Sequence, residues 1–158
     1  MTTPAADRPE QPLALLASLR AFSEVADRVA DQASRALGLH RTDLRALSIL
    51  MRRTSRGLAT TPTDLGHGLH LTRAATTSVI DRLVASGHAR RARSATDGRR
   101  VIVEPTPAAS ADGSAAFGPM ARRIAAALEG FDDAELATAL RVVDAATRSI
   151  APLAEDGP

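Results

Sequence analysis

The sequence predicts a mainly α-helical protein with one small β-hairpin, in the order four helices, hairpin, two helices. Apolar residues recur at spacings of three and four along most of the chain, which is the period of a helix buried on one face. The run Val101-Ile102-Val103 is the strongest β-forming segment, and the dipeptide Asp97-Gly98 before it is typical of a hairpin tip.

The first helix is expected over residues 13–37, with Gly38 as its C-terminal stop. Its apolar face begins with residues spaced by three and four: Leu16, Leu19, Phe22, Val25 and Val29. Residues 1–12 are polar and contain three prolines, so we expect a flexible N-terminus without the basic start and apolar stretch of a secretory signal.

The next two helices have candidate N-caps. Thr42 is expected to cap a second helix that ends near Arg53. A third, short helix begins at Thr61-Pro62-Thr63-Asp64, where a capping threonine is followed by proline and then by an acid three residues after the cap.

The fourth helix is expected to begin after Thr72 and to end at Gly87. Its inner side is predicted to comprise Ala75, Thr76, Val79, Ile80 and Leu83. Because only a short turn separates it from the third helix, the pair has the pattern of a helix-turn-helix.

The hairpin strands are expected over residues 88–93 and 99–104, with Pro105 and Pro107 ending the second strand. A fifth helix should run from Pro107 to about Gly130, with a kink near Pro119. The acidic pattern from Asp132 to Glu135 predicts a sixth helix, which Pro152 ends.

Charge is concentrated in the middle of the chain. Twelve of the 20 basic residues, all of them arginines, lie within residues 41–100 against four acidic residues, although the net charge of the chain is only +2. A basic centre between neutral and acidic ends indicates a segment that binds a polyanion. The chain has no cysteine, so disulfides and thiolate metal sites are excluded.

The exposed side of the fourth helix is predicted to be short and polar, with arginine at its edges. We expect it to enter the DNA major groove, where threonine methyl groups contact thymine and arginine contacts guanine or phosphate. The predicted recognition residues are Thr72, Arg73, Ala74, Thr77, Ser78 and Arg82, and Asp81 lies on the same side.

The hairpin is crowded with arginine, and such strands would repel each other unless they faced an anion. A thin basic ribbon fits a DNA minor groove, where negative potential is concentrated. The predicted wing residues are Arg91, Arg93, Asp97, Arg99 and Arg100.

These features resemble the MarR (multiple antibiotic resistance regulator) family. The resemblance is carried by Asp64-Leu65-Gly66, Leu69-His70-Leu71-Thr72, Asp81-Arg82-Leu83, Gly87-His88-Ala89-Arg90-Arg91 and Asp97-Gly98-Arg99-Arg100. The sequence departs from the family pattern at Gly66, which predicts a loose third helix, and at His88-Ala89, which predicts less apolar packing of the first strand. The unusual pair Glu104-Pro105 puts the end of the second strand in question.

The resemblance implies a homodimer held by residues 13–41 and 106–152, with residues 42–105 forming a winged helix-turn-helix on a pseudo-palindromic operator in double-stranded DNA. It implies that Asp97 pairs with Arg99, with Arg100 or Arg93 as substitutes, and that a wing arginine enters the minor groove. It also implies a small-molecule effector pocket, whose walls would be largely aliphatic because the chain has three Phe and no Tyr or Trp.

Other functions fit less well. The sequence lacks a glycine-rich phosphate loop, a nucleophile elbow and paired carboxylates in an apolar setting, so we expect no enzyme and no cofactor. His67 and His70 have a spacing compatible with zinc, but we expect them to be surface residues, and no metal site is predicted. A winged-helix adaptor that binds protein is the alternative.

The sequence therefore predicts a cytoplasmic, dimeric, sequence-specific transcriptional regulator without a membrane segment. We expect a repressor that a small-molecule ligand releases from DNA.

Overall fold

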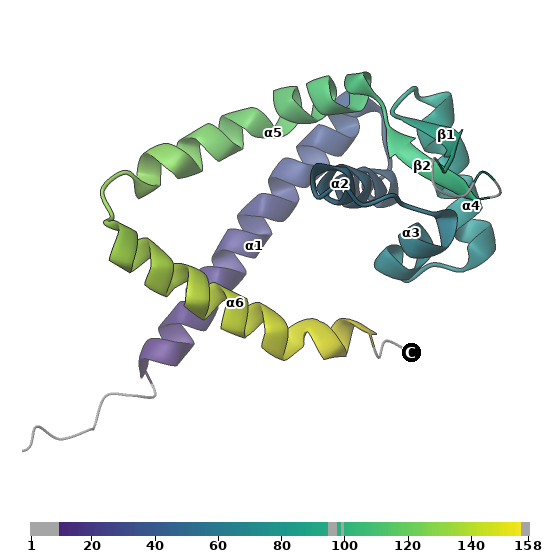
Figure 1. The fold of residues 1–158 in the computed structure, drawn as a ribbon. Coiled ribbons are helices and arrows are strands. Elements are labelled where there is room, and N and C mark those ends of the chain that lie inside the picture. The colour runs from purple at the N-terminus through teal and green to yellow at the C-terminus, as the bar shows by residue number, and fades with distance from the viewer. Residues whose placement is uncertain (1–9, 95–97, 99, 156–158) are drawn as a thin grey trace, which may run out of the picture.

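A computed structural model describes residues 10–94, 98 and 100–155, with the side chains of residues 154 and 155 excluded. It confirms the predicted order of four helices, a hairpin and two helices (Figure 1). The elements are α1 (Glu10–Leu37), α2 (Arg41–Ser55), α3 (Pro62–Leu69), α4 (Arg73–Ala85), β1 (Ala89–Arg93), β2 (Val101–Pro105), α5 (Pro107–Leu128) and α6 (Asp133–Glu155).

The N-terminus of α2 differs from the prediction. Thr42 lies within the first turn, and the N-cap is His40, whose backbone is extended and whose N–H donates to the carboxylate of Asp43 at 3.4 Å. The predicted caps of α3 and α4 are confirmed, because the hydroxyls of Thr61 and Thr72 accept from backbone N–H groups three residues later.

Pro152 does not end the last helix, as the sequence predicted that it would, and Pro119, where a kink was predicted, lies inside a continuous helix. α5 continues through Pro119 without a break, and α6 continues through Pro152 to Glu155. Each proline removes one backbone donor, and Pro152 does so only in the last turn of α6. The start of α6 is as predicted, because Asp132 and Glu135 each accept the other's backbone N–H, at 2.9 and 2.8 Å.

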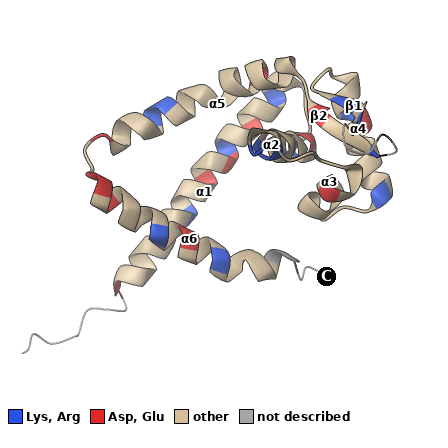
Figure 2. Ribbon diagram, in the orientation of Figure 1, with Lys and Arg blue, Asp and Glu red and all other residues tan. Residues whose placement is uncertain are grey.

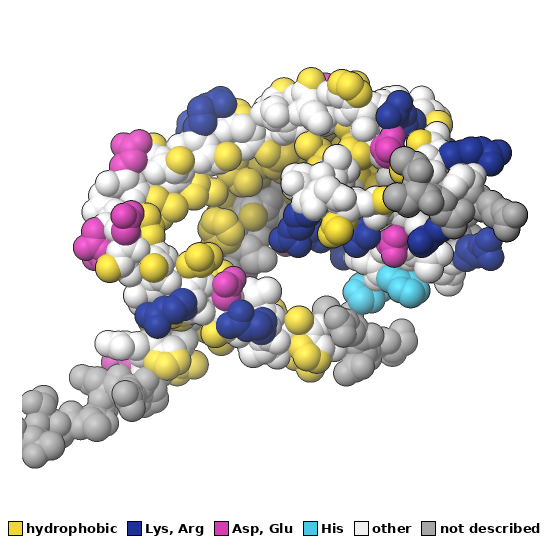
Figure 3. Space-filling view, in the orientation of Figure 1, with side chains coloured by type: hydrophobic (Ala, Val, Ile, Leu, Met, Phe, Trp, Pro, Cys, Tyr) yellow, Lys and Arg dark blue, Asp and Glu magenta, His cyan; other side chains and the backbone are white. Residues whose placement is uncertain are grey.

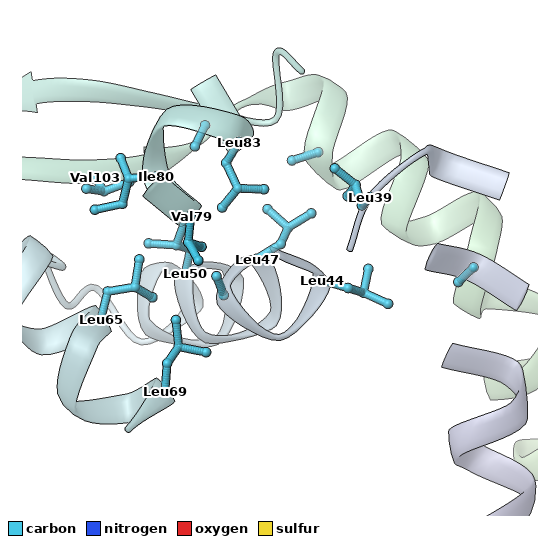
Figure 4. Packing of buried hydrophobic residues seen from close by; sticks show 14 residues of the cluster. Leu39, Leu44, Leu47, Leu50, Leu65, Leu69, Val79, Ile80, Leu83 and Val103 are labelled. Carbon is cyan, nitrogen blue, oxygen red and sulfur yellow. The ribbon is translucent and has the colours of Figure 1, made fainter. Parts of the chain in front are cut away.

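The hydrophobic core lies in the lobe formed by α2, α3, α4 and the hairpin (Figure 4). α2 runs through its centre. The buried residues labelled in Figure 4 are Leu39, Leu44, Leu47, Leu50, Leu65, Leu69, Val79, Ile80, Leu83 and Val103. The predicted inner face of α4 is thus largely correct, with Thr76 also buried and Ala75 half-buried.

Gly66 gives α3 a close contact with α4. A methyl group at Gly66 would lie 2.8 Å from the hydroxyl oxygen of Thr76, closer than Cβ atoms come to such neighbours. Gly66 is itself buried, and the looseness of α3 stays a prediction. The missing side chain provides the space that Thr76 occupies.

The strands β1 and β2 pair antiparallel, with Arg91 opposite Val103. β2 is also attached to the α2–α3 loop, since the N–H of Val103 donates to the carbonyl of Thr60 at 2.8 Å. Pro105 forms the last residue of β2, and Gly98 lies in the turn, whereas the predicted tip residue Asp97 lies outside the described residues.

His88 joins the hairpin to the C-terminal helices. It is buried, and its ring contacts the hydroxyl of Ser86 at 2.8 Å and the carboxylate of Asp112 on α5 at 3.0 Å. The apolar packing that the sequence predicted to be lost here is therefore replaced by polar contacts to two partners.

The helices α1, α5 and α6 form an open frame beside this lobe. α5 leads away from the hairpin, and α6 turns back and crosses α1 in the view of Figure 1. No residue of α6 with a described side chain is buried. The large apolar side chains exposed on α1 and α6 include Leu13, Leu16, Phe22, Val25, Leu140, Val143 and Ile150.

None of the described helices combines the length and apolar character that crossing a bilayer requires.

Candidate nucleic-acid interface

The outer face of α4 is exposed as predicted. Four of the predicted recognition residues lie on it after the N-cap Thr72: Arg73, Ala74, Thr77 and Ser78. Asp81 lies on the same face, because residues 74, 77, 78 and 81 are spaced by three and four. The face is narrow and carries short side chains around one carboxylate, a shape suited to a groove.

The two hydroxyls on this face are bonded back to the helix. Thr77 donates to the carbonyl of Arg73 at 2.9 Å, and Ser78 donates to the carbonyl of Ala74 at 3.2 Å. A hydroxyl has one hydrogen, so each oxygen then presents only lone pairs outward.

Arg82 is turned away from this face. Its guanidinium donates to both carboxylate oxygens of Asp43 on α2, with Nε at 2.9 Å from Oδ2. Asp43 is buried, and its hydrogen bond raises the pKa of Arg82 above the ordinary value. In this arrangement Arg82 links two helices of the lobe, so we remove it from the residues proposed to read DNA.

The wing is linked to the recognition helix by one ion pair. Arg91 of β1 lies 2.6 Å from the carboxylate of Asp81, through its Nη2 atom. Both side chains are substantially exposed. The pair places a predicted wing arginine beside the outer face of α4.

Two other arginines of β1 have partners within the protein. Arg90 forms an ion pair with Glu104 on β2 at 2.7 Å, and Arg93 donates to the carbonyl of Gly98 at 3.0 Å. At Arg90 the anion that the crowded strands were expected to face is Glu104, which belongs to the hairpin itself.

The remaining wing predictions fall at the tip. Arg100 is exposed, whereas Asp97 and Arg99, with their predicted pairing, lie outside the described residues. Arg100 lies close enough to Asp64 at the start of α3 to act on it electrostatically.

Asp64 anchors the α2–α3 loop. Hydrogen bonds from the backbone N–H and the hydroxyl of Thr61, at 2.9 and 2.7 Å, lower the pKa of Asp64, and the charges of Arg53 and Arg100 add to this effect. Arg53 also donates to the carbonyl of Ala59 at 2.9 Å, so this network fixes the loop on which β2 rests.

A cavity of about 750 Å³ lies between α1, α2, α3 and α5. Its lining includes the apolar residues Leu44, Ile49 and Phe117, arginines of α2, and Asp27 of α1. The sequence predicted aliphatic walls for an effector pocket, but the cationic part of this lining was not anticipated.

His67 and His70 are exposed, as expected for surface residues. His70 is the C-cap of α3, in the left-handed region at φ 54°. Within residues 10–94, 98 and 100–155, no three metal-ligating side chains form a group that could hold an ion.

Sequence reasoning missed two acidic residues of this region. Asp81 was placed on the outer face but given no role, although its position among the exposed residues of α4 was visible in the helical period. Asp43 stands three residues after the cap of α2, and nothing in its spacing indicates a partner 39 residues away.

Comparisons with known proteins agree with this architecture. A model of the MarR family matches residues 37–100. No curated protein is significantly similar to the chain.

Solved structures with a similar fold include proteins of the MarR family. A mutant MepR from S. aureus is 15% identical with a TM-score of 0.70, covering 86% of this chain and 96% of that one. A MarR family protein from Bacillus stearothermophilus is 18% identical with a TM-score of 0.67, covering 92% and 99%. A MepR–DNA complex from S. aureus is 18% identical with a TM-score of 0.57, covering 80% and 95%.

The family match covers the helix-turn-helix and the beginning of the hairpin, and the fold of the solved structures extends over nearly the whole chain. Over residues 37–100 this chain is thus similar to the MarR family, and its overall fold is that of a solved MarR family protein.

Proposed function

We propose that this protein binds a pseudo-palindromic operator in double-stranded DNA as a homodimer and thereby regulates transcription. In each subunit, α4 enters the major groove and the wing contacts the adjacent minor groove. The observation that carries the proposal is the ion pair between Asp81 and Arg91, which places the wing beside the outer face of α4.

Electrostatics supports this orientation. Figure 3 shows basic side chains gathered at the end of the molecule that carries the wing. Figure 2 shows acidic residues gathered at the opposite end, where α5 turns into α6. This separation orients the basic end toward a polyanion during approach. A MepR structure of similar fold was solved with DNA, which agrees with the proposal.

The homodimer is supported by the exposed apolar face of α6. Leu140, Val143 and Ile150 lie on one side of this helix and remain exposed in a single chain. A helix without tertiary packing is only marginally stable in water. A second copy would cover this face, together with Leu16 and Phe22 of α1.

The proposed DNA-binding and dimerisation regions have the boundaries that the sequence predicted. Residues 42–105 form the DNA-binding lobe, and residues 13–41 and 106–152 form the dimerisation region; residues 10–12, predicted to belong to a flexible N-terminus, are part of α1. The contact between His88 and Asp112 connects the two parts.

The cavity of about 750 Å³ is the site proposed for an effector. It touches α1 and α5 of the dimerisation region and α2 and α3 of the lobe, so a ligand there would change the separation of the two recognition helices. A ligand that binds more tightly to the conformation in which the recognition helices are not spaced for DNA would release a repressor from its operator.

The test is selection of a binding site from random duplex DNA, followed by affinity measurements at several salt concentrations. If about 6–10 phosphates are contacted, affinity should fall by about 10³–10⁵ between 50 and 200 mM salt. Arg100→Ala should weaken binding and reduce the salt slope, whereas the control Arg141→Ala on α6 should not. A flat salt response without an enriched sequence would instead favour a protein-binding adaptor.

A further inference from the structure

The recognition face of α4 presents hydrogen-bond acceptors and methyl groups at its centre. Thr77 and Ser78 have already donated their hydroxyl hydrogens to carbonyls of α4. Asp81 is a carboxylate, which accepts only, and Ala74 and Thr77 contribute methyl groups to the same exposed face.

Donors are confined to the edges of this face. Arg73 stands at the N-terminal end and pairs with no acid among the residues that the structure describes. Arg91 stands at the other end and is held by Asp81 at 2.6 Å. Arg82, the arginine nearest the middle of the helix, is bonded to Asp43 inside the lobe.

The base edges have a complementary chemistry. In the major groove, the donors are the N6 amino group of adenine and the N4 amino group of cytosine, and the apolar group is the thymine methyl. Guanine offers only the acceptors N7 and O6, which a face of acceptors cannot bind and which a carboxylate repels.

The geometry points to an operator half-site read through exocyclic amino groups and thymine methyls. A C·G pair faces Asp81, because a carboxylate accepts from cytosine N4, whereas adenine is typically bound through N6 and N7 together by a side chain that both accepts and donates. A·T pairs face Ala74, Thr77 and Ser78. Guanine is read, if at all, only where Arg73 reaches it. This inference rests on the proposed function and specifies the DNA that it requires.

The pairing with Arg91 explains how a carboxylate can occupy this face. An isolated carboxylate would be repelled by the phosphates on both sides of the groove. The guanidinium of Arg91 neutralises Asp81 through one of its oxygens, Oδ1. The other oxygen remains available to accept from a base, and the other guanidinium donors can reach a phosphate.

The test uses the site selected from random duplex DNA, modified at one base at a time. N4-methylcytosine alters the cytosine donor, deoxyuridine removes a thymine methyl, and 7-deazaguanine removes guanine N7. We expect N4-methylcytosine at one position of each half-site to weaken binding by roughly five-fold or more. Deoxyuridine should weaken binding at the neighbouring positions, whereas 7-deazaguanine should act at no position facing Asp81, Ser78 or Thr77.

The variant Asp81→Ala identifies the residue responsible. It should bind non-specific DNA at least as well as wild type but should lose its sensitivity to N4-methylcytosine, while the remote acidic control Asp133→Ala should keep it. Unchanged sensitivity in Asp81→Ala, or a site whose binding depends on guanine N7 instead, would overturn the inference and leave the proposed function standing. Failure to enrich any sequence would refute the proposed specific binding itself.

Discussion

Asp43 of α2 and Arg82 of α4 form a bidentate ion pair across the lobe. The side chain of Asp43 is 1% exposed and that of Arg82 is 41% exposed. The pair joins the central helix of the core to the inner edge of the recognition helix. A side chain that the sequence assigned to DNA therefore contributes to the lobe's internal structure.

Removing one partner of this pair should cost more than removing both. Arg82→Ala leaves a buried carboxylate without its cation, and we expect a loss of about 2–3 kcal/mol in the free energy of unfolding. Removing one partner of a fully buried pair costs about 3–5 kcal/mol. The expected loss here is smaller because the guanidinium is partly hydrated. Urea denaturation at a fixed protein concentration measures the difference.

The double variant Asp43→Asn with Arg82→Gln serves as the control for this pair. It removes both charges and should lose less stability than Arg82→Ala. DNA affinity of the folded double variant should remain near wild type. A large loss of DNA affinity in a stable double variant would show that Arg82 contacts DNA after all.

The contact between Gly66 and Thr76 predicts that a single methyl group is harmful. Gly66→Ala should destabilise the protein by about 1–3 kcal/mol, because the added carbon would lie 2.8 Å from the Thr76 hydroxyl in a packed interior. Thermal unfolding provides the measurement. The matched control is Gly68→Ala, whose added carbon meets only the flexible end of Ile49 at 3.2 Å and should cost less. Equal behaviour of the two alanine variants would argue against the close contact.

Asp64 predicts an acid-dependent loss of stability at the start of α3. Its pKa is lowered in the folded protein by hydrogen bonds from Thr61, so folding favours the charged carboxylate. The contribution is therefore present above the unfolded pKa of about 4 and is lost as the pH falls through the lower folded value. Asp64→Ala should cost about 0.5–2 kcal/mol at pH 7, as the loss of a cap does, and less at pH 2–3.

The measurement for Asp64 is the difference in thermal unfolding between wild type and Asp64→Ala at the two pH values. Glu129→Gln, at the C-terminal end of α5, controls for the loss of one carboxylate. If the difference for Asp64→Ala stayed constant across this range, its carboxylate charge would have no part in stabilising α3.

The exposed face of α6 predicts that a charge there separates the subunits. Leu140→Asp should raise the dissociation constant of the homodimer by roughly 100-fold or more, because burying an unpaired carboxylate costs several kcal/mol. Helix content should fall at the same time, since α6 would lose its packing. Sedimentation and circular dichroism measure the two effects.

Ser149→Asp adds the same charge on the opposite side of α6 and should leave the oligomeric state unchanged. Dimers that persist in Leu140→Asp, or dissociation that is equal in both variants, would contradict the proposed interface.

The sequence predicted most of what depends on neighbouring residues. The caps at Thr61 and Thr72 use bonds that span three residues, and the period of α4 showed which side faces outward. The errors at local positions were small, such as Thr42 in place of His40 as the cap of α2.

Long side chains were less predictable than helices. Arg82 lies at the margin of the outer face of α4, where its side chain can extend either into the lobe or toward solvent. The direction of the Arg82 side chain depends on the buried carboxylate of Asp43, and no short-range sequence pattern connects these two residues. His88 could likewise not be assigned to Asp112, which lies 24 residues further along the chain.

The sequence by itself determined the order of the elements, the helix-turn-helix and the outer face of α4, because helical period and capping are local properties of the chain. Only the tertiary structure decided which arginines remain available to DNA. Arg82, Arg90 and Arg91 each have a carboxylate partner that folding brings beside them, and this pairing determines the donors and acceptors that the surface presents.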